Sequence, residues 1–258
     1  MLIIILLLLL IILSTVSSLL DLEKLEKFII NDKDYFEDMD IYFINLKSRT
    51  LKRSQMESQL KRHNIIANAF DAVDGKKLNR NDLNMKNIIS DNLSRVEMNG
   101  RTLRKGEIGC SLSHITIWKK FLSSKKKYLM IFEDDAILED NFKENLNSIL
   151  SNLDNINYKW DALYLNENCY RHFKSNCNGN FITNNVIKPK NVGYGCYGYI
   201  LKKNFINKCL SDLFPIVIPV DNFIIKKSQL DPSLIVLRTE NPLVNYDKNY
   251  ISDTIYIK

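Results

Sequence analysis

Short apolar runs of strand length alternate along this chain with longer segments whose apolar residues recur every three or four positions. The runs that predict strands lie at 41–46, 65–75, 128–132, 161–165, 195–201, 215–221 and 234–238. Polar or glycine-containing turns end these runs, as Gly75 ends the second one. Short apolar runs of this kind are typical of strands in the interior of a protein, with helices or loops between them.

Four segments between these runs have the spacing of helices. Their apolar residues are Met56 and Leu60; Ile108, Leu112, Ile115 and Leu122; Phe142, Leu146, Ile149, Leu150 and Leu153; and Phe205, Cys209 and Leu213. Ser48 can cap the first helix, and the second extends over 103–122. The alternation of strands and helices predicts an α/β fold with a mainly parallel central sheet and flanking helices. The Asn- and Gly-rich segment 166–195 predicts a long loop.

The run at 128–132 ends in three consecutive carboxylates, Glu133, Asp134 and Asp135. Ligands of open α/β sheets collect just outside the carboxyl ends of such strands. Three neighbouring negative charges repel one another and are costly to desolvate, so a hard divalent cation would compensate them. Strand alternation lets Glu133 and Asp135 face one way and Asp134 the other. A solvated turn leading into a helix near Asp140 is the alternative interpretation.

The composition suits one enzyme-sized domain. The 258 residues are 45% hydrophobic and 26% charged, and no Pro/Gly/Ser-rich linker or internal repeat divides them. The formal net charge of +6 favours an anionic ligand such as a nucleotide diphosphate. Basic residues are scattered rather than interleaved with aromatic residues in a stripe, so we expect no nucleic-acid partner.

Six sequence blocks stand out along the chain. They are I-N-L-x-x-R at Ile44–Arg49, A-V-D-G at Ala72–Gly75, G-E-I-G-C-S-L-S-H at Gly106–His114, F-E-D-D at Phe132–Asp135, P-V-D at Pro219–Asp221 and S-D at Ser252–Asp253. In this order they resemble glycosyltransferase family 25, the group that includes bacterial lipooligosaccharide galactosyltransferases and animal procollagen galactosyltransferases. The resemblance covers roughly residues 40 to 255. The E-D-D triplet alone is weak evidence, but its conjunction with the G-E-I-G-C-S-L-S-H block is specific.

The resemblance implies a GT-A-like nucleotide-diphospho-sugar transferase fold. It also implies transfer of a hexose, galactose or glucose, from a UDP-sugar to a hydroxyl of a glycan or of a hydroxylysine-bearing, collagen-like protein. A bound Mn²⁺ or Mg²⁺ would neutralise the leaving diphosphate. Asp135 is the first expected metal ligand, and Asp134 and Glu133 would share the work through the metal, its water or the ribose. The chain has Glu-Asp-Asp-Ala rather than Asp-x-Asp, which leaves this division open.

Three residues outside the acidic triplet are expected to meet the nucleotide. Asn45 and Arg49 follow the first strand, and the guanidinium fork of Arg49 matches the paired oxygens of a diphosphate. Asp74 would reach the uracil or the ribose. Turn hydrogen bonds are the alternative role of Asn45 and Asp74. The loop at 166–195 is a candidate for acceptor binding.

Two further residues are candidates for the chemistry itself. His114 either contacts the diphosphate or acceptor, or is a satisfied histidine where helix meets sheet. It does not form a nucleophilic pair with Ser113, because adjacent helical side chains point about 100° apart. If transfer inverts the anomeric centre, as the resemblance suggests, a carboxylate must accept the proton of the acceptor hydroxyl, and Asp221 is our candidate. The alternative role of Asp221 is to cap the helix that begins there.

The N-terminal segment differs from the rest of the chain. Leu2–Leu13 is an uninterrupted apolar block followed by small residues, which is typical of a secretory signal peptide, although an uncleaved type II signal anchor is also long enough. We expect a signal peptide or anchor at 1–20, a short polar lead-in at 21–39 and one glycosyltransferase domain at 40–258. Both a signal peptide and a signal anchor would direct the domain to the lumen of the endoplasmic reticulum or Golgi, or to the outside of the cell. A signal anchor would in addition attach the protein to the membrane through residues 1–20.

The cysteines and histidines of the chain predict neither a disulfide framework nor a zinc site. The five cysteines are an odd number, so at least one is unpaired. Cys169 and Cys177 could form a local disulfide, whereas Cys110 and Cys209 are expected as buried free thiols. No C-x-x-C or H-E-x-x-H spacing occurs, and the three histidines are too far apart in the sequence to predict a zinc site. Asn92-Leu93-Ser94 matches the N-glycosylation pattern.

Two other classes of protein fit parts of the sequence. A carbohydrate-binding or scaffold protein could keep the fold and lose turnover, although the intact acids and Arg49 count against this. A glycoside hydrolase would use two carboxylates across a glycosidic bond and need neither nucleotide nor metal. Release of UDP from UDP-sugars in the presence of Mn²⁺ would separate the three classes.

Overall fold

The computed structural model describes residues 33–166, 179–190 and 195–247. The chain divides into a unit at Met1–Tyr35, described only at its last three residues, and a unit at Phe36–Lys258. The expectations for residues 1–20, for Cys169 and Cys177 and for Ser252–Asp253 lie outside the described residues.

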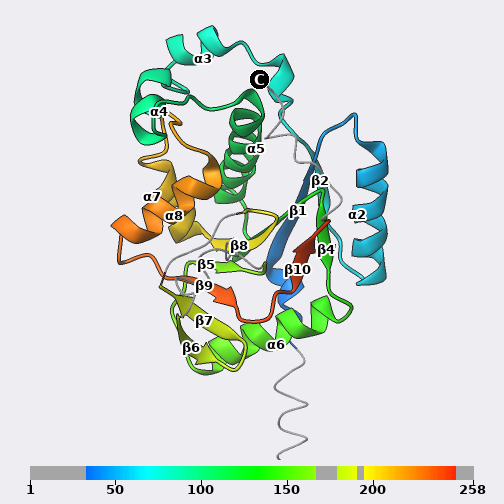
Figure 1. Ribbon diagram of the computed structural model, residues 1–258. Coiled ribbons are helices and arrows are strands. Elements are labelled where there is room, and N and C mark those ends of the chain that lie inside the picture. Colours follow the sequence, from blue (N-terminus) through cyan, green and yellow to red (C-terminus); the bar gives the residue numbers. More distant parts are fainter. Residues whose placement is uncertain (1–32, 167–178, 191–194, 248–258) are drawn as a thin grey trace, which may run out of the picture. The chain divides into compact units, whose positions relative to one another are not determined.

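An eight-stranded mixed sheet lies at the centre of the second unit, within the described ranges (Figure 1). Its strands, in spatial order, are β2 (Asn68–Asp71), β1 (Met39–Asn45), β3 (Tyr128–Glu133), β8 (Gly198–Lys202), β5 (Ala162–Tyr164), β9 (Val236–Thr239), β7 (Val186–Pro189) and β6 (Gly179–Thr183). Strands β7 and β8 run opposite to the other six. The α/β fold with a mainly parallel sheet is therefore confirmed. A separate antiparallel pair joins β4 (Ala136–Leu138) to β10 (Val244–Tyr246).

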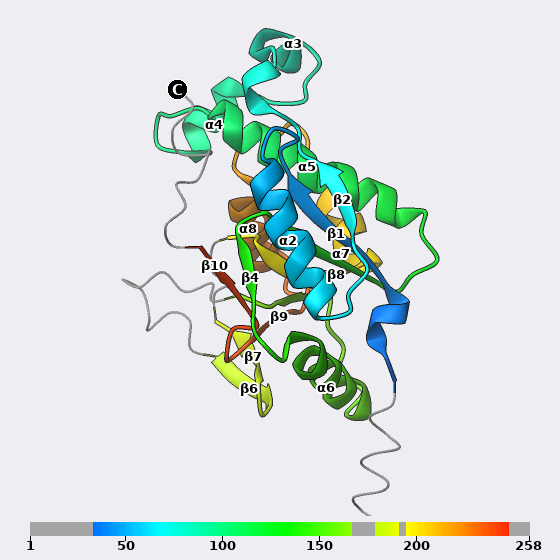
Figure 2. The same ribbon diagram turned by 90° about the vertical axis from the view of Figure 1, so that its right-hand side faces the viewer.

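Helices cover both faces of this sheet (Figures 1 and 2). One face carries α5 (Lys105–Leu122), α7 (Lys203–Leu210) and α8 (Val220–Leu230), and the other carries α2 (Thr50–Arg62) and α6 (Phe142–Asn155). The shorter helices are η1 (Tyr35–Asp38), η2 (Gly75–Lys77), α3 (Arg80–Met85) and α4 (Asp91–Glu97). Among the described residues, no helix combines the length and apolar character needed to span a bilayer.

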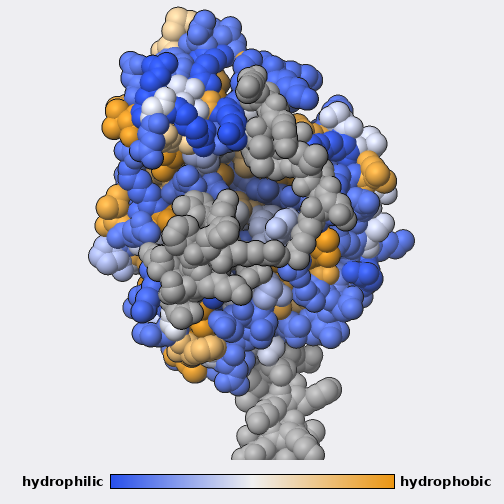
Figure 3. All heavy atoms as spheres, viewed as in Figure 1, coloured by the Kyte–Doolittle hydropathy of each residue, from blue (hydrophilic) through white to orange (hydrophobic). Residues whose placement is uncertain are grey.

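Side-chain alternation along β3 builds the two halves of the core. Leu129 and Ile131 belong to the apolar cluster that includes residues of α5, α7 and α8. Phe132 points to the other face and meets Phe142 of α6 edge to face, with 5.7 Å between ring centroids. Both strand faces are therefore buried, which explains why the run at 128–132 is continuously apolar rather than alternating. The side of the molecule seen in Figure 3 is mainly hydrophilic, with separate small hydrophobic patches.

Three local predictions from the sequence were wrong. The run at 215–221 is not a strand, because its two prolines lack the N–H that a ladder needs and Val220 already begins α8. The expected loop at 166–195 contains the antiparallel hairpin of β6 and β7. Ser48 does not cap α2, since its N-cap is Arg49.

Candidate active site

Three parallel strands end at one edge of the sheet and bring their following turns together. Asn45 of β1 lies opposite Asp71 of β2, and Ile44 lies opposite Glu133 of β3. The turns after these strands and one side of α5 enclose a pocket with a volume of about 240 Å³. Its polar lining is made by Ser48, Arg49, Asp74, Lys76, Cys110, Ser113, His114, Glu133, Asp134 and Asp135. Six of the eight residues expected at the site therefore line one pocket, and Asn45 and Asp221 do not.

Of the three acids, only Glu133 belongs to β3. Asp134 and Asp135 form a turn that leads into β4 rather than into a helix, so strand alternation stops and all three carboxylates line the pocket. Burial, followed by the negative charges of Glu133 and Asp134, raises the pKa of Asp135 to about 7. Its Oδ1 atom is buried and has no hydrogen-bond partner.

A hard divalent cation fits this turn. The donors are carboxylate oxygens, one of them buried and unpartnered, and a cation would offset the mutual repulsion that raises the pKa of Asp135. Arg49 extends the charged surface, with Nη1 3.8 Å from Oδ1 of Asp134. The pocket therefore presents fixed negative charge next to a guanidinium, an arrangement that can accept a metal-bound diphosphate.

Asp74 and Asn45 make the turn contacts that were their alternative roles. Oδ1 of Asp74 accepts a hydrogen bond from the backbone N–H of Lys76 at 3.0 Å and so caps η2, while the residue also lines the pocket. Asn45 is buried, and its Nδ2 donates to the carbonyl of Leu46 at 2.8 Å. Its Oδ1 is buried without a partner.

The G-E-I-G-C-S-L-S-H block forms the first half of α5, and its small residues let the helix approach the A-V-D-G turn. A Cβ atom on Gly109 would lie 2.5 Å from the carbonyl oxygen of Val73, and one on Gly75 would lie 2.2 Å from that of Lys105. Ser113 ties the two together, since its Oγ accepts from Val73 N at 2.9 Å and donates to Gly109 O at 2.8 Å. The two blocks are thus one packing unit that positions the turn carrying Asp74.

His114 is fully buried, and both of its ring nitrogens have partners. Nδ1 lies 2.7 Å from Oη of Tyr199, and Nε2 lies 3.2 Å from Oε1 of Glu133. Tyr199 Oη also accepts a hydrogen bond from Trp118 Nε1 at 3.1 Å. Because a carboxylate only accepts, Nε2 is the donor in the contact with Glu133, and Nδ1 can then accept from the hydroxyl of Tyr199. His114 is therefore a satisfied histidine at the helix–sheet junction, and its contact with diphosphate or acceptor stays a prediction.

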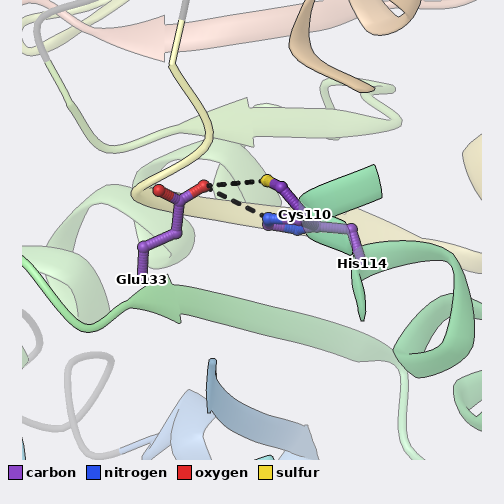
Figure 4. A group of neighbouring side chains, drawn as sticks. All are labelled: Cys110, His114 and Glu133. Carbon is purple, nitrogen blue, oxygen red and sulfur yellow. Dashed lines mark hydrogen bonds and ion pairs between the residues drawn. The ribbon is translucent and has the colours of Figure 1, made fainter. Parts of the chain in front are cut away.

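Cys110 lies one helical turn before His114. It is a free thiol, as expected, but it lines the pocket instead of packing only within the core. Its Sγ lies 4.0 Å from Oε1 of Glu133 (Figure 4). Burial, then the negative charges of Glu133 and Asp221, raises the pKa of the Cys110 thiol. Cys209, by contrast, is fully buried as expected.

Asp221 lies in the first turn of α8, two residues after the N-cap Pro219. Its carboxylate accepts hydrogen bonds from the backbone N–H of Asn222 at 2.8 Å and of Gly195 at 3.3 Å. Burial raises the pKa of Asp221, those backbone donors oppose the rise, and the charge of Glu133 adds to it. Asp221 thus binds one first-turn N–H group of α8, that of Asn222, without being the N-cap, and its role as a base stays a prediction.

Sequence reasoning missed several residues that build this site. Ser111 Oγ accepts from the backbone N–H of Val220 at 3.2 Å and so joins the start of α8 to α5. Tyr199 orients His114, and Ser48 and Lys76 line the pocket. The available signals were a serine within an apolar helix and a tyrosine within the apolar strand β8, since buried hydroxyls need partners.

Ligands of open α/β sheets bind in the crevice outside the carboxyl ends of the strands, and this is where the acid-lined pocket lies. The family model described as Glycosyltransferase family 25 (LPS biosynthesis protein) matches residues 38–224. The chain belongs to glycosyltransferase family 25. The GT-A-like fold that the resemblance implies is therefore confirmed.

Individual relatives agree with this assignment. Procollagen galactosyltransferase 2 of Homo sapiens is 29% identical over 222 residues, which are 86% of this chain and 33% of that protein. Probable inactive glycosyltransferase 25 family member 3 of Rattus norvegicus is 37% identical over 128 residues, 49% of this chain and 22% of that protein. The chain therefore spans at most about a third of the length of these two relatives.

Among solved structures, a glycosyltransferase involved in the glycosylation of the major capsid of PBCV-1 aligns with 83% of this chain and 94% of its own, with a TM-score of 0.43 and 9% identity.

Proposed function

We propose that this chain transfers a hexose from a UDP-sugar to a hydroxyl of a glycan or of a hydroxylysine-bearing, collagen-like protein, with inversion and with the help of Mn²⁺ or Mg²⁺. Galactose is the first candidate, because a relative is named a procollagen galactosyltransferase, and glucose is the second. The observation that carries the proposal is the pocket in which Glu133, Asp134, Asp135 and Arg49 meet in a family 25 chain.

The polar residues of the pocket divide the binding of the donor. Asp135, with its unpartnered buried oxygen, and Asp134 would hold the cation, which when bound would neutralise the leaving diphosphate. Arg49 lies beside Asp134 and would pair with the diphosphate oxygens. Glu133 and Asp74 face the same space and are our candidates for the ribose and uracil. Asn45 is not among the lining residues, and through its hydrogen bond to the carbonyl of Leu46 it would stabilise the turn after β1.

The proton of the acceptor hydroxyl needs a carboxylate to receive it, and Asp221 has suitable properties. Its raised pKa makes it a stronger base than an exposed aspartate, and two backbone N–H groups fix its orientation. The Nε2–H group of His114 donates a hydrogen bond to Oε1 of Glu133 and so holds that carboxylate in place within the pocket. His114 would contact the diphosphate or acceptor only through this edge of its ring.

A non-catalytic carbohydrate-binding or scaffold role is the second candidate function. It is favoured by the relative named as a probable inactive family member, which matches half of this chain. Binding without turnover would need the pocket but not the proton acceptor. A measurement that separates donor binding from transfer therefore distinguishes the two functions.

The test is release of UDP from UDP-galactose and UDP-glucose by the full chain, with and without Mn²⁺, in the presence of glycan and hydroxylysine-peptide acceptors. We expect metal-dependent release that requires an acceptor. UDP binding without release under any condition would support the non-catalytic role, and hydrolysis of a glycan without nucleotide would indicate a hydrolase.

A substitution in the acidic turn, Asp134 and Asp135, tests whether this turn holds the metal. Asp135→Asn should abolish metal-dependent UDP binding while the melting temperature is unchanged or higher, because it removes an ionic ligand and relieves repulsion in the turn. Asp140→Asn, at an exposed acid beyond β4, is the matched control. Calorimetric titration of UDP with and without Mn²⁺ measures the effect. Unchanged metal-dependent affinity in Asp135→Asn would move the metal to another position.

For location, we propose that residues 1–20 direct a single transferase domain at 40–258 into the secretory lumen or to the outside. The uninterrupted apolar block at Leu2–Leu13 supports this proposal. Glycan or collagen-like acceptors pass through the same compartment.

A further inference from the structure

A second group of metal-binding side chains lies beside the acidic turn. Within the described residues, one ligand atom each from Cys110, His114 and Glu133 lie within 4.8 Å of one another. Figure 4 shows the two side chains of α5 projecting together toward Glu133 at the end of β3. We propose that these three residues bind Zn²⁺ or a similarly soft divalent ion, and that the bound ion closes the donor pocket.

The geometry of the three residues is close to that of a zinc centre. Cys110 and His114 are four residues apart on α5 and therefore share one face of the helix. Oε1 of Glu133 lies 3.2 Å from Nε2 of His114 and 4.0 Å from Sγ of Cys110. Around a tetrahedral zinc ion with bonds of about 2.0–2.3 Å, neighbouring ligand atoms are about 3.3–3.8 Å apart. The two observed distances bracket that range.

The donor set favours a soft ion over Mn²⁺ or Mg²⁺. A thiolate, an imidazole and one carboxylate are ligands typical of zinc, whereas the carboxylates of the acidic turn suit harder ions. All three residues line the pocket, so the fourth position faces space that water or a phosphate oxygen can fill. Three protein ligands with one open position are therefore available to the ion.

Proton positions can adjust to this binding. Tyr199 contacts Nδ1 of His114 at 2.7 Å, and a hydroxyl can accept as well as donate. When Nε2 binds the ion, its proton moves to Nδ1, which then donates to Tyr199, the kind of outer contact that orients metal-bound histidines. The thiol proton of Cys110 is released to solvent as the sulfur–metal bond forms.

Glu133 belongs to both groups, which couples them. An ion held by Cys110 and His114 takes one carboxylate away from the acidic triplet and occupies part of a pocket of about 240 Å³. Binding of this ion and binding of the donor should therefore exclude each other. This consequence rests on the proposed function, whereas the existence of the metal site does not.

Cobalt is the direct probe of the site, because tetrahedral Co²⁺ bound to a thiolate absorbs visibly and gives a sulfur-to-metal charge-transfer band. The full chain, stripped of metal and kept reduced, is titrated with Co²⁺ and then with Zn²⁺. We expect a thiolate band that saturates at one equivalent and is bleached by Zn²⁺. Absence of the band in the wild-type chain would overturn the proposal, whatever the outcome of transferase assays.

Variants assign the band to these residues. Cys110→Ser should remove it, and Tyr199→Phe should keep it but weaken the affinity by about tenfold. The double variant Cys169→Ser/Cys177→Ser controls for cysteines outside the described residues and should retain the band. A melting curve of each variant checks that it is folded. A band that survives Cys110→Ser, or that disappears only in the double variant, would overturn the assignment.

The coupling is tested by titrating UDP in the presence of Mn²⁺, with and without one equivalent of Zn²⁺. We expect Zn²⁺ to weaken UDP binding to the wild-type chain at least tenfold and to have no such effect on Cys110→Ser. If UDP does not bind under any condition, the proposed function fails while the cobalt result still stands. Equal UDP affinity with and without Zn²⁺ would overturn the closure of the pocket.

Discussion

Single polar residues at this site serve the local structure and face the pocket at once. Asp74 caps η2 with one oxygen and also lines the pocket, and a carboxylate with two oxygens is not exhausted by one hydrogen bond. The sequence could therefore predict the residue types and their place, because they follow predicted strands. The sequence could not show which of these residues cap a turn and which bind a ligand, because both roles use the same polar side chains.

A substitution at Asp221 can separate a structural role at the start of α8 from a catalytic role as the general base. The two N–H groups bond to different oxygens, Asn222 to Oδ1 and Gly195 to Oδ2, so Asp221→Asn keeps one of these bonds and loses the other. We therefore expect a stability loss of about 1 kcal/mol. Loss of a general base should lower the transfer rate roughly 10²- to 10⁴-fold with UDP affinity preserved. Rate, UDP affinity and melting temperature are measured together, with exposed Asp212→Asn as the control. Near-normal turnover would remove Asp221 from the mechanism.

At the scale of elements, the long helices with an apolar stripe were predictable, whereas the short polar elements were not. The pattern over 103–122 predicts α5 to within two residues, because its stripe packs on the core. Helices α3 and α4 were not predicted, because they are short and polar. Asn79 and Ser90 nevertheless cap them with side-chain hydrogen bonds. The hairpin at 179–189 was not predicted because its strands and turn contain Asn, Thr and Gly, residues typical of turns.

The close approach of α5 to the A-V-D-G turn gives a prediction at this scale. Gly109→Ala places a methyl group 2.5 Å from the carbonyl oxygen of Val73, so the helix and the turn must separate. We expect a loss of about 1–3 kcal/mol in the free energy of unfolding and weaker UDP binding, since Asp74 moves with the turn. Thr116→Ala, on an exposed face of the same helix, is the control. Wild-type stability and affinity in Gly109→Ala would mean that this contact does not position the pocket.

Helices α3 and α4 are joined by an ion pair whose contribution should depend on pH. Arg80 donates to Asp91 through Nε at 2.7 Å, and this contact lowers the pKa of Asp91, with help from Asn84. A carboxyl whose pKa is lower in the folded than in the unfolded state stabilises the fold above its unfolded pKa. The stabilisation is lost as the pH falls through about 4 and below.

The comparison that checks this is the melting temperature of the wild type minus that of Asp91→Asn across pH. We expect a full difference at neutral pH that shrinks on acidification, and Asp82→Asn, at a half-buried acid of α3, is the control and should show a smaller change. A difference that is constant with pH would assign the effect to packing rather than to charge.

At the scale of the whole molecule, the sequence predicts the number of layers better than the order of the strands. Strand β8 inserts antiparallel between β3 and β5, although its sequence is as continuously apolar as that of its parallel neighbours. A strand buried on both faces carries no pattern that specifies its direction. The acidic site could be placed from sequence because it depends on the end of one strand, whereas Cys110, His114 and Glu133 come together only through the packing of α5 on β3.

The core of the second unit is made by residues that follow the N-terminal segment in the sequence, and this allows a final prediction. The main buried cluster is made by residues from Tyr42 to Val236, so deletion of residues 1–20 removes none of its members. We expect the shortened chain to stay in the supernatant after ultracentrifugation with vesicles and to keep the melting temperature and UDP affinity of the full chain. The full chain is the control, since its Leu2–Leu13 block should increase partitioning unless it has been cleaved. Membrane partitioning that persists after the deletion, or a large fall in melting temperature, would show that residues 1–20 are not a separable targeting segment.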